Sequence, residues 1–208
     1  MVRKTVLSAL FVLLCITAAG QNQEFKYVDA SRLNVIGKVL PTSKPFARVD
    51  TSVYKFNSRT IDAYAEYSTG LAVLFRTDSR NIKARWETSA SNSGSNMTAI
   101  LTKGLDLYIR DGGKWVFAGV GNPDMKKEPH DVHDRMIVGD MAEGVKECLL
   151  YLPMFDRVES LEIGVDEGAS IEPMENPFRH KIVFKGSSIT HGASAARAGL
   201  SYTAQFAR

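Results

Sequence analysis

Leu105-Asp-Leu-Tyr-Ile-Arg110 and Lys114-Trp-Val-Phe117, joined by Asp111-Gly-Gly113, form the stretch that indicates the fold most clearly. Apolar residues take every second position in the first half, which is the period of a strand with one buried face. An Asp-Gly-Gly sequence between two such runs is typical of a hairpin turn. The stretch therefore predicts an antiparallel β-hairpin.

The same pattern continues on both sides of this hairpin. Upstream, residues 71–76 form an apolar run, and residues 82–88 alternate between apolar and charged side chains, which predicts that Trp86 is a core residue. Downstream, residues 145–152 and 161–165 read as further strands. No amphipathic helix of convincing length interrupts this region. Many short antiparallel strands predict a mainly β fold, a β-sandwich of the jelly-roll type.

The character of the chain changes after this strand-rich region. Residues 167–179 contain Gly and Pro at positions that interrupt any regular element, so they read as a linker. Lys181-Ile-Val-Phe-Lys-Gly-Ser-Ser-Ile-Thr-His-Gly192 follows, and it reads as a short buried strand and a sharp turn, with helix-compatible residues 193–208 behind it. Ser188 would lie beyond the carboxyl end of the strand, near helix N–H groups that can hold developing negative charge. A nucleophile and an ordinary N-cap serine both fit this position.

Residues 186–192 resemble the first sequence block of the SGNH/GDSL hydrolases, in which Gly-Asp-Ser-Leu/Ile-Thr-x-Gly surrounds the nucleophile. By this match Ser188 is the catalytic nucleophile, and its backbone N–H is a donor of the oxyanion hole. Ser187 stands where most of the superfamily has Asp, but a branch written Gly-Thr-Ser-Ile-Thr-Gln-Gly also has a hydroxyl there. Ser187 and His191 are expected to line the pocket.

Upstream blocks resemble the N-terminal accessory domain of the same branch. Gly104-Leu-Asp-Leu-Tyr108 matches its Gly-x-Asp-Leu-Tyr signature, and the resemblance covers about residues 25–208. It implies a β-sandwich accessory domain over residues 21–175. Residues 176–208 would then be the first strand–turn–helix of an SGNH-type α/β domain, which is flavodoxin-like. From the residues alone, this last part could instead pack on the sandwich as an appendage.

The resemblance implies a serine esterase that hydrolyses acyl esters, acetyl esters on carbohydrates among them, through an acyl-enzyme and without a cofactor. The family's Gly and Asn of the oxyanion hole and its Asp-x-x-His have no matching position here. We therefore expect the chain to be a fragment that is inactive by itself. The alternative function is a non-catalytic carbohydrate-binding or docking module. In either case Asp106 and Tyr108, on the strand face opposite the apolar residues, would lie at an interdomain contact or a carbohydrate-binding surface.

Two histidine patterns and one cysteine carry weaker signals. His191 follows Ser188 by three residues and could be a local base, but the spacing does not secure the geometry that a base needs, so a place on the pocket rim is expected. His130-Asp-Val-His-Asp134 could supply metal ligands, yet a metal would need further ligands; we expect a solvated loop and assign no metal ligand. Cys148 is expected to be a buried small hydrophobe.

The first 20 residues read as a signal peptide, with Arg3 and Lys4 before an apolar run and small residues at its end. Cys15 raises the alternative of a lipoprotein, although Leu14 stands where a small residue is needed. We expect a periplasmic or secreted protein without a membrane span after cleavage. Removing the leader lowers the net charge of +3 by two, which gives no reason to expect nucleic acid. The expected partner is an acylated carbohydrate or another small ester.

Overall fold

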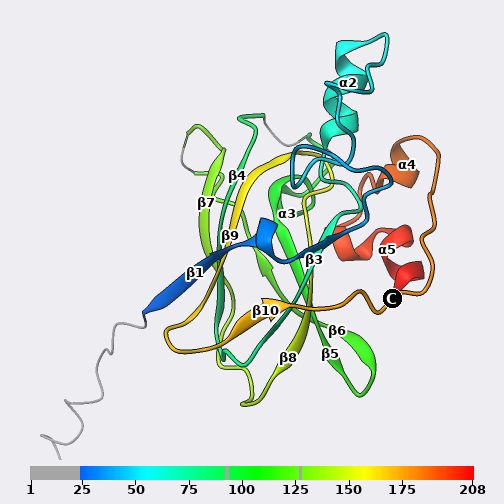
Figure 1. The fold of residues 1–208 in the computed structure, drawn as a ribbon. Coiled ribbons are helices and arrows are strands. Elements are labelled where there is room, and N and C mark those ends of the chain that lie inside the picture. The colour runs from blue at the N-terminus through cyan, green and yellow to red at the C-terminus, as the bar shows by residue number, and fades with distance from the viewer. Residues whose placement is uncertain (1–23, 92–93, 127) are drawn as a thin grey trace, which may run out of the picture.

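The structure is a computed structural model that describes residues 24–91, 94–126 and 128–208. The signal peptide expected over residues 1–20 lies outside this part of the chain. Within it, two antiparallel sheets pack face to face, and the C-terminal helices lie against one of them (Figure 1). This confirms the mainly β sandwich predicted from the strand alternation. No helix in the described ranges is long and apolar enough to cross a membrane.

The first sheet has four strands. Their order across the sheet is β1 (Phe25–Asp29), β9 (Val158–Asp166), β4 (Ile82–Thr88) and β7 (Val132–Val138). All neighbouring strands pair antiparallel. Buried and more exposed residues alternate along β4, as the period of two predicts for a strand with one covered face.

The second sheet contains the predicted hairpin. Its order is β10 (Ile171–Pro173), β3 (Ala72–Thr77), β8 (Lys146–Tyr151), β5 (Leu105–Asp111) and β6 (Lys114–Gly121), with β2 (Asn34–Ile36) also paired to β3. In β3, β5 and β8, runs of consecutive residues are buried, rather than every second one. Both faces of this sheet are therefore covered over its central strands.

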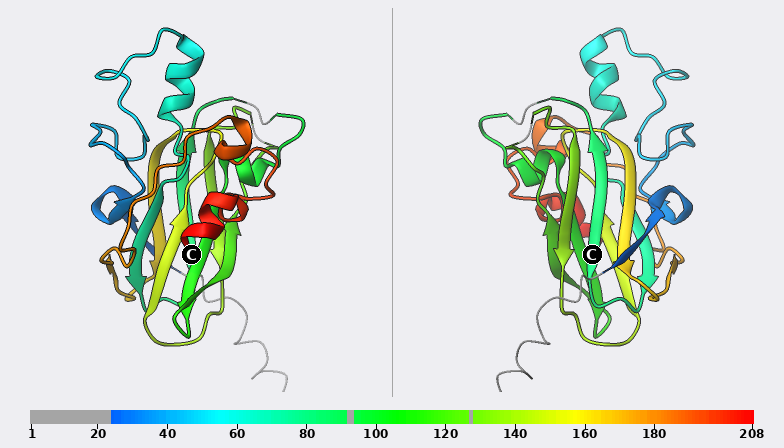
Figure 2. Two further views of the ribbon diagram at one scale, coloured as in Figure 1. Left: turned by 90° about the vertical axis from the view of Figure 1, so that its right-hand side faces the viewer. Right: turned by 90° about the vertical axis from the view of Figure 1, so that its left-hand side faces the viewer.

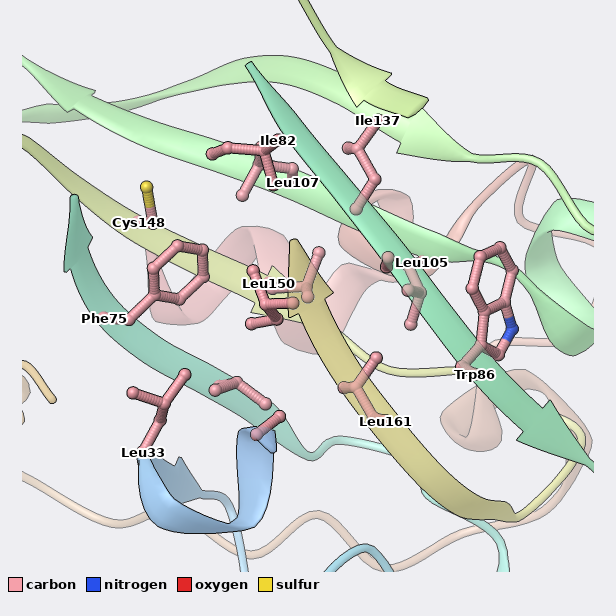
Figure 3. Packing of buried hydrophobic residues seen from close by; sticks show 14 of the residues in the cluster. Leu33, Phe75, Ile82, Trp86, Leu105, Leu107, Ile137, Cys148, Leu150 and Leu161 are labelled. Carbon is pink, nitrogen blue, oxygen red and sulfur yellow. The ribbon is translucent and has the colours of Figure 1, made fainter. Parts of the chain in front are cut away.

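The space between the sheets holds the main core (Figure 3). Trp86, expected in the core, is 1% exposed and donates a hydrogen bond from Nε1 to the Lys103 carbonyl at 2.8 Å. Cys148 is fully buried, as predicted for a small hydrophobe, and burial raises the pKa of its thiol to about 12. These apolar side chains supply the main stabilisation of the sandwich, since no disulfide is formed among the described residues.

A second core lies on the outer face of the larger sheet. It joins Leu74, Tyr108 and Leu149 of the sheet to Ala198 and Ala204 of the C-terminal segment. The segment contains α4 (Ser188–His191), a 3₁₀ turn (Ala198–Leu200) and α5 (Tyr202–Ala207). Figure 2 shows these elements, in orange and red, lying along the outer side of the green strands.

Three local expectations are wrong. The strand predicted over residues 181–185 does not form, because no strand lies beside it in the described chain and a strand needs a neighbour for its backbone hydrogen bonds. Its apolar side chains are exposed. Two short helices, α2 (Arg59–Glu66) and α3 (Ala99–Lys103), occur where none was expected, and both are too short for a clear helical period. The loop expected around residues 130–134 instead leads into β7, which begins at Val132.

Candidate active site

Ser188 is the first residue of α4, a helix of one turn, and its side chain is exposed. Ser187 precedes it in extended conformation, and its side chain makes no capping hydrogen bond. The first N–H groups of a helix have no partner within it, so they are available to a ligand. The structure thus places the predicted nucleophile where the sequence expects it in relation to the turn and the helix, without the preceding strand.

Gly192 ends this helix and sets it against the sandwich. Its φ of +106° lies in the left-handed region, which favours glycine. A Cβ atom at this position would also come within 2.7 Å of Cε of Met154, the flexible end of a side chain that can move. The last glycine of the serine block therefore has a structural reason, which is the left-handed backbone that ends α4.

His191 points at the sandwich and anchors α4 there. Its Nε2 lies 2.6 Å from both the Met154 carbonyl and the Thr69 hydroxyl, and its ring stacks on Phe155 with centroids 4.2 Å apart. A carbonyl oxygen only accepts, so Nε2 carries a proton and cannot act as a base at that atom. Burial, reinforced by the charge of Arg48, lowers the pKa of His191.

The three predicted site residues line one cavity of about 1190 Å³ between the sandwich and the C-terminal segment. Ser187, Ser188 and His191 form part of its wall. Aromatic side chains from the end of α2 contribute another part, among them Tyr64 and the capping residue Tyr67, whose rings lie 5.3 Å apart. The cavity is large enough for an ester substrate with a ring-sized group on one side of the bond.

Asp106 and Tyr108 lie on the outer face of β5, as the alternation predicts, but that face is not open. Their exposed fractions are 0% and 4%, because residues 197–208 cover them. Of the two roles left open by the sequence, the contact between the sandwich and the C-terminal segment is the one that this geometry supports. Burial raises the pKa of the Asp106 carboxyl, while the Gly199 N–H and the Arg197 guanidinium oppose that shift.

The histidine-rich stretch is a loop only in its first part, since His130 and Asp131 lie in the turn before β7 and the remaining residues belong to that strand. His133 is 1% exposed in β7, and its ring lies against Trp86 with centroids 4.9 Å apart. Its Nδ1 accepts a hydrogen bond from the Asp124 amide, and burial lowers its pKa to about 4. His130 pairs with Glu128. Among the described residues, no group of three or more His, Cys, Asp or Glu side chains could hold a metal ion.

Several residues that hold the site had no sequence signal. Thr69 and Phe155 position His191, and Arg197 bonds to Asp106, but each is a common residue type in an ordinary context. Their roles follow only from the residues that they contact in the folded structure. A sequence pattern could not have identified them, since each contact joins segments separated by tens of residues.

A model of the GxDLY family, the N-terminus of SGNH-hydrolase-type esterases, matches residues 25–171. A solved structure of a GDSL-like lipase from Bacteroides ovatus shares 44% identity, with a TM-score of 0.84 over 89% of this chain and 53% of that one. Salicylyl-acyltransferase SsfX3 from a tetracycline biosynthetic pathway shares 16% identity and a TM-score of 0.52, over 73% of this chain and 42% of its own, so this likeness concerns the fold alone. The chain thus spans about half the length of these structures or less. No curated protein matches it.

Proposed function

The chain belongs to the GxDLY family, the N-terminal domain of SGNH-hydrolase-type esterases, and from this premise we propose that Ser188 is the nucleophile of a serine esterase. The full protein would hydrolyse acyl esters, with acetyl esters on carbohydrates as the expected substrates. The observation that carries the proposal is the position of Ser188. It is exposed at the start of α4 and lines the large cavity, while the sandwich holds the other end of the same helix.

The proposed reaction has two steps. The Ser188 Oγ attacks the acyl carbonyl carbon, a general base takes the hydroxyl proton, and the tetrahedral intermediate expels the alcohol, which receives that proton. Water then attacks the acyl-enzyme and gives one proton to the base, which passes it to the Ser188 oxygen as the carboxylic acid leaves. The backbone N–H of Ser188 is proposed as one oxyanion donor. By resemblance to the family, the base is a histidine of an Asp-x-x-His motif beyond residue 208, and no cofactor takes part.

The carbohydrate part of the proposal rests on the walls of the cavity. Tyr64, Tyr67 and Phe155 present aromatic rings there, and such rings can stack on sugar faces. Polar groups line the same cavity, which suits a substrate that carries many hydroxyls. Export to the periplasm or the medium, proposed from the leader sequence, would give the enzyme access to polysaccharides.

The test uses the full-length protein and an aryl acetate. Ser188→Ala is expected to lower kcat by several orders of magnitude, whereas Ser187→Ala, the matched control one residue away, should cost far less. A fluorophosphonate should add its mass to the wild-type protein and not to Ser188→Ala. Full activity in Ser188→Ala would refute the assignment. The 208-residue chain alone is expected to show no hydrolysis above background.

A further inference from the structure

The Gly-x-Asp-Leu-Tyr block contacts the segment that follows the serine block. Nη1 of Arg197 lies 2.9 and 3.0 Å from the two carboxylate oxygens of Asp106, and it donates to the Tyr108 hydroxyl at 2.7 Å. The amide N–H of Gly199 donates to the same carboxylate at 2.7 Å. Asp106 and Tyr108 belong to the Gly-x-Asp-Leu-Tyr block, while Arg197 and Gly199 follow the serine block by a few residues.

The contact between Asp106 and Arg197 is largely buried. The Asp106 side chain is 1% exposed and that of Arg197 is 20% exposed. The Arg197 guanidinium also lies 3.9 Å from the centre of the Phe117 ring, where a cation is attracted by the ring face. Because water is largely excluded, removing Arg197 would leave the buried Asp106 carboxylate with only the Gly199 N–H and the charge of Arg208, which makes this pair a strong constraint on the position of the segment.

Gly199 also fits closely against Asp106 and Tyr108, beside the ion pair with Arg197. A Cβ atom on Gly199 would come within 2.4 Å of a ring carbon of Tyr108 and 2.8 Å of a carboxylate oxygen of Asp106. The backbone of the C-terminal segment therefore reaches the floor of the site only because this residue has no side chain. We refer to Asp106, Tyr108, Arg197 and Gly199 together as the clamp.

The clamp and His191 both bind the short path from α4 to α5 to the sandwich. His191 is bonded to the Met154 carbonyl and stacked on Phe155. Between them, the Thr98 hydroxyl donates to the Ala196 carbonyl at 2.6 Å. Ser188 lies three residues before His191, and Arg197 lies six residues after it. With both ends of this path bound to the sandwich, α4 has little freedom to rotate or shift relative to the cavity.

We propose that the clamp positions the nucleophile, so that Asp106 and Tyr108 of the sandwich act as positioning residues for Ser188. This inference rests on the proposed esterase function. It gives the sandwich a role within the active site, instead of that of a separate binding module. The Gly-x-Asp-Leu-Tyr block then has a physical meaning: its outward-facing Asp and Tyr receive the segment that follows the serine block.

The experiment compares kcat and KM for an aryl acetate in the full-length protein, well below its melting temperature. Asp106→Asn and Arg197→Met are expected to lower kcat by about 10²-fold with little change in KM, as misplacement of a reacting group by about 1 Å does. Arg197→Lys keeps a cation that can donate to the same acceptors, so it should recover most of the loss. Glu147→Gln is the matched control, because Glu147 bridges Arg76 and Arg110 on the same sheet, and it should retain wild-type kcat.

Gly199→Ala tests the clamp without changing any charge. Its methyl group should displace the segment from Tyr108, and kcat should fall while Asp106 and Arg197 remain. This variant and Arg197→Lys keep the inference testable if Asp106→Asn does not fold. Wild-type kcat in both Arg197→Met and Gly199→Ala would overturn the inference, even if the melting temperature falls, because a merely structural role would lower stability alone.

A second measurement separates this inference from the proposed function. Hydrogen exchange of residues 187–192 in the 208-residue chain does not depend on catalysis. Faster exchange in Arg197→Met than in Glu147→Gln supports the clamp, and equal exchange in the two variants contradicts it. Ser188→Ala in the full-length protein tests the nucleophile independently. Loss of activity there, with Arg197→Met at wild-type kcat, would leave the esterase standing and reject the clamp.

Discussion

Replacing His191 separates two roles that the sequence left open, a catalytic base and an anchor of the serine helix. In the structure the side chain makes a 2.6 Å hydrogen bond to the Met154 carbonyl and a stacked contact with Phe155. Such a hydrogen bond contributes about 1 kcal/mol, and a stacked ring pair contributes about 0.5–1.5 kcal/mol. The carbonyl keeps a second donor, the Thr69 hydroxyl at 2.6 Å, so removing His191 does not leave a buried acceptor unpaired.

If His191 only anchors α4, these contributions limit how far its replacement can lower kcat. Loss of about 2 kcal/mol shifts the docking equilibrium of α4 by about 30-fold, since each 1.4 kcal/mol is a factor of ten. His191→Ala should therefore lower kcat of the full-length protein by at most about that factor. Removal of the base from a serine hydrolase costs far more, on the order of 10⁴-fold or above. The losses of kcat expected for an anchor and for a base therefore differ by more than two orders of magnitude.

Two further variants divide the anchor into its parts. His191→Phe keeps the stacking on Phe155 and loses the hydrogen bond, whereas His191→Gln can keep a donor for the Met154 carbonyl and loses the ring. Neither side chain can act as a base, yet both are expected to be more active than His191→Ala on an aryl acetate. If both variants are as inactive as Ser188→Ala, His191 is the base and the reasoning above is wrong.

Three further predictions concern the sandwich in the 208-residue chain. Cys148 should not react with a thiol reagent until the protein unfolds, because its raised thiol pKa of about 12 leaves no thiolate near pH 7; rapid labelling of the native protein would contradict this. His133 stays neutral in the fold down to a pKa of about 4, while in the unfolded chain it binds a proton below about 6.5. The free energy of unfolding should thus fall by up to about 1.4 kcal/mol per pH unit as the pH drops from 6.5 to 4, and a urea titration of His133→Gln should lack this part of the slope. Trp86→Ala should cost about 3–5 kcal/mol in urea denaturation, against less than about 0.5 kcal/mol for Val116→Ala at an exposed site, and similar costs for the two would refute the assigned core.

Most strands of the sandwich could be predicted from local sequence patterns. The hairpin of β5 and β6 was predictable because the turn sequence Asp111-Gly-Gly113 stands between an alternating run and a run of aromatic and β-branched residues. β7 was missed because its first residue, Val132, is exposed and is followed by three polar residues, among them His133, a polar side chain that faces the core. A period of two is visible only when the buried positions are apolar.

Less of the candidate site than of the fold could be predicted from the sequence. The block around Ser188 predicted the turn, the helix and the residue at its start, since these depend on neighbours in the chain. The strand over residues 181–185 failed as a prediction, because a strand forms only where another strand offers hydrogen bonds. The clamp could not be predicted either, as it joins Asp106 to residues more than 90 positions later.

The pattern of β3 and β8 nevertheless indicates that the outer face of the larger sheet is covered. Antiparallel sheets that face water alternate apolar with polar residues. Ala72-Val-Leu-Phe75 and Cys148-Leu-Leu-Tyr151 do not alternate, and in the structure both faces of these runs are buried. One face meets the four-stranded sheet and the other meets the segment that follows Ser188. The sequence therefore indicates that the outer face of the sandwich packs against another part of the protein, and in the described chain the segment that follows the proposed nucleophile covers part of it. This packing supports the proposal that the sandwich and the serine block form one site.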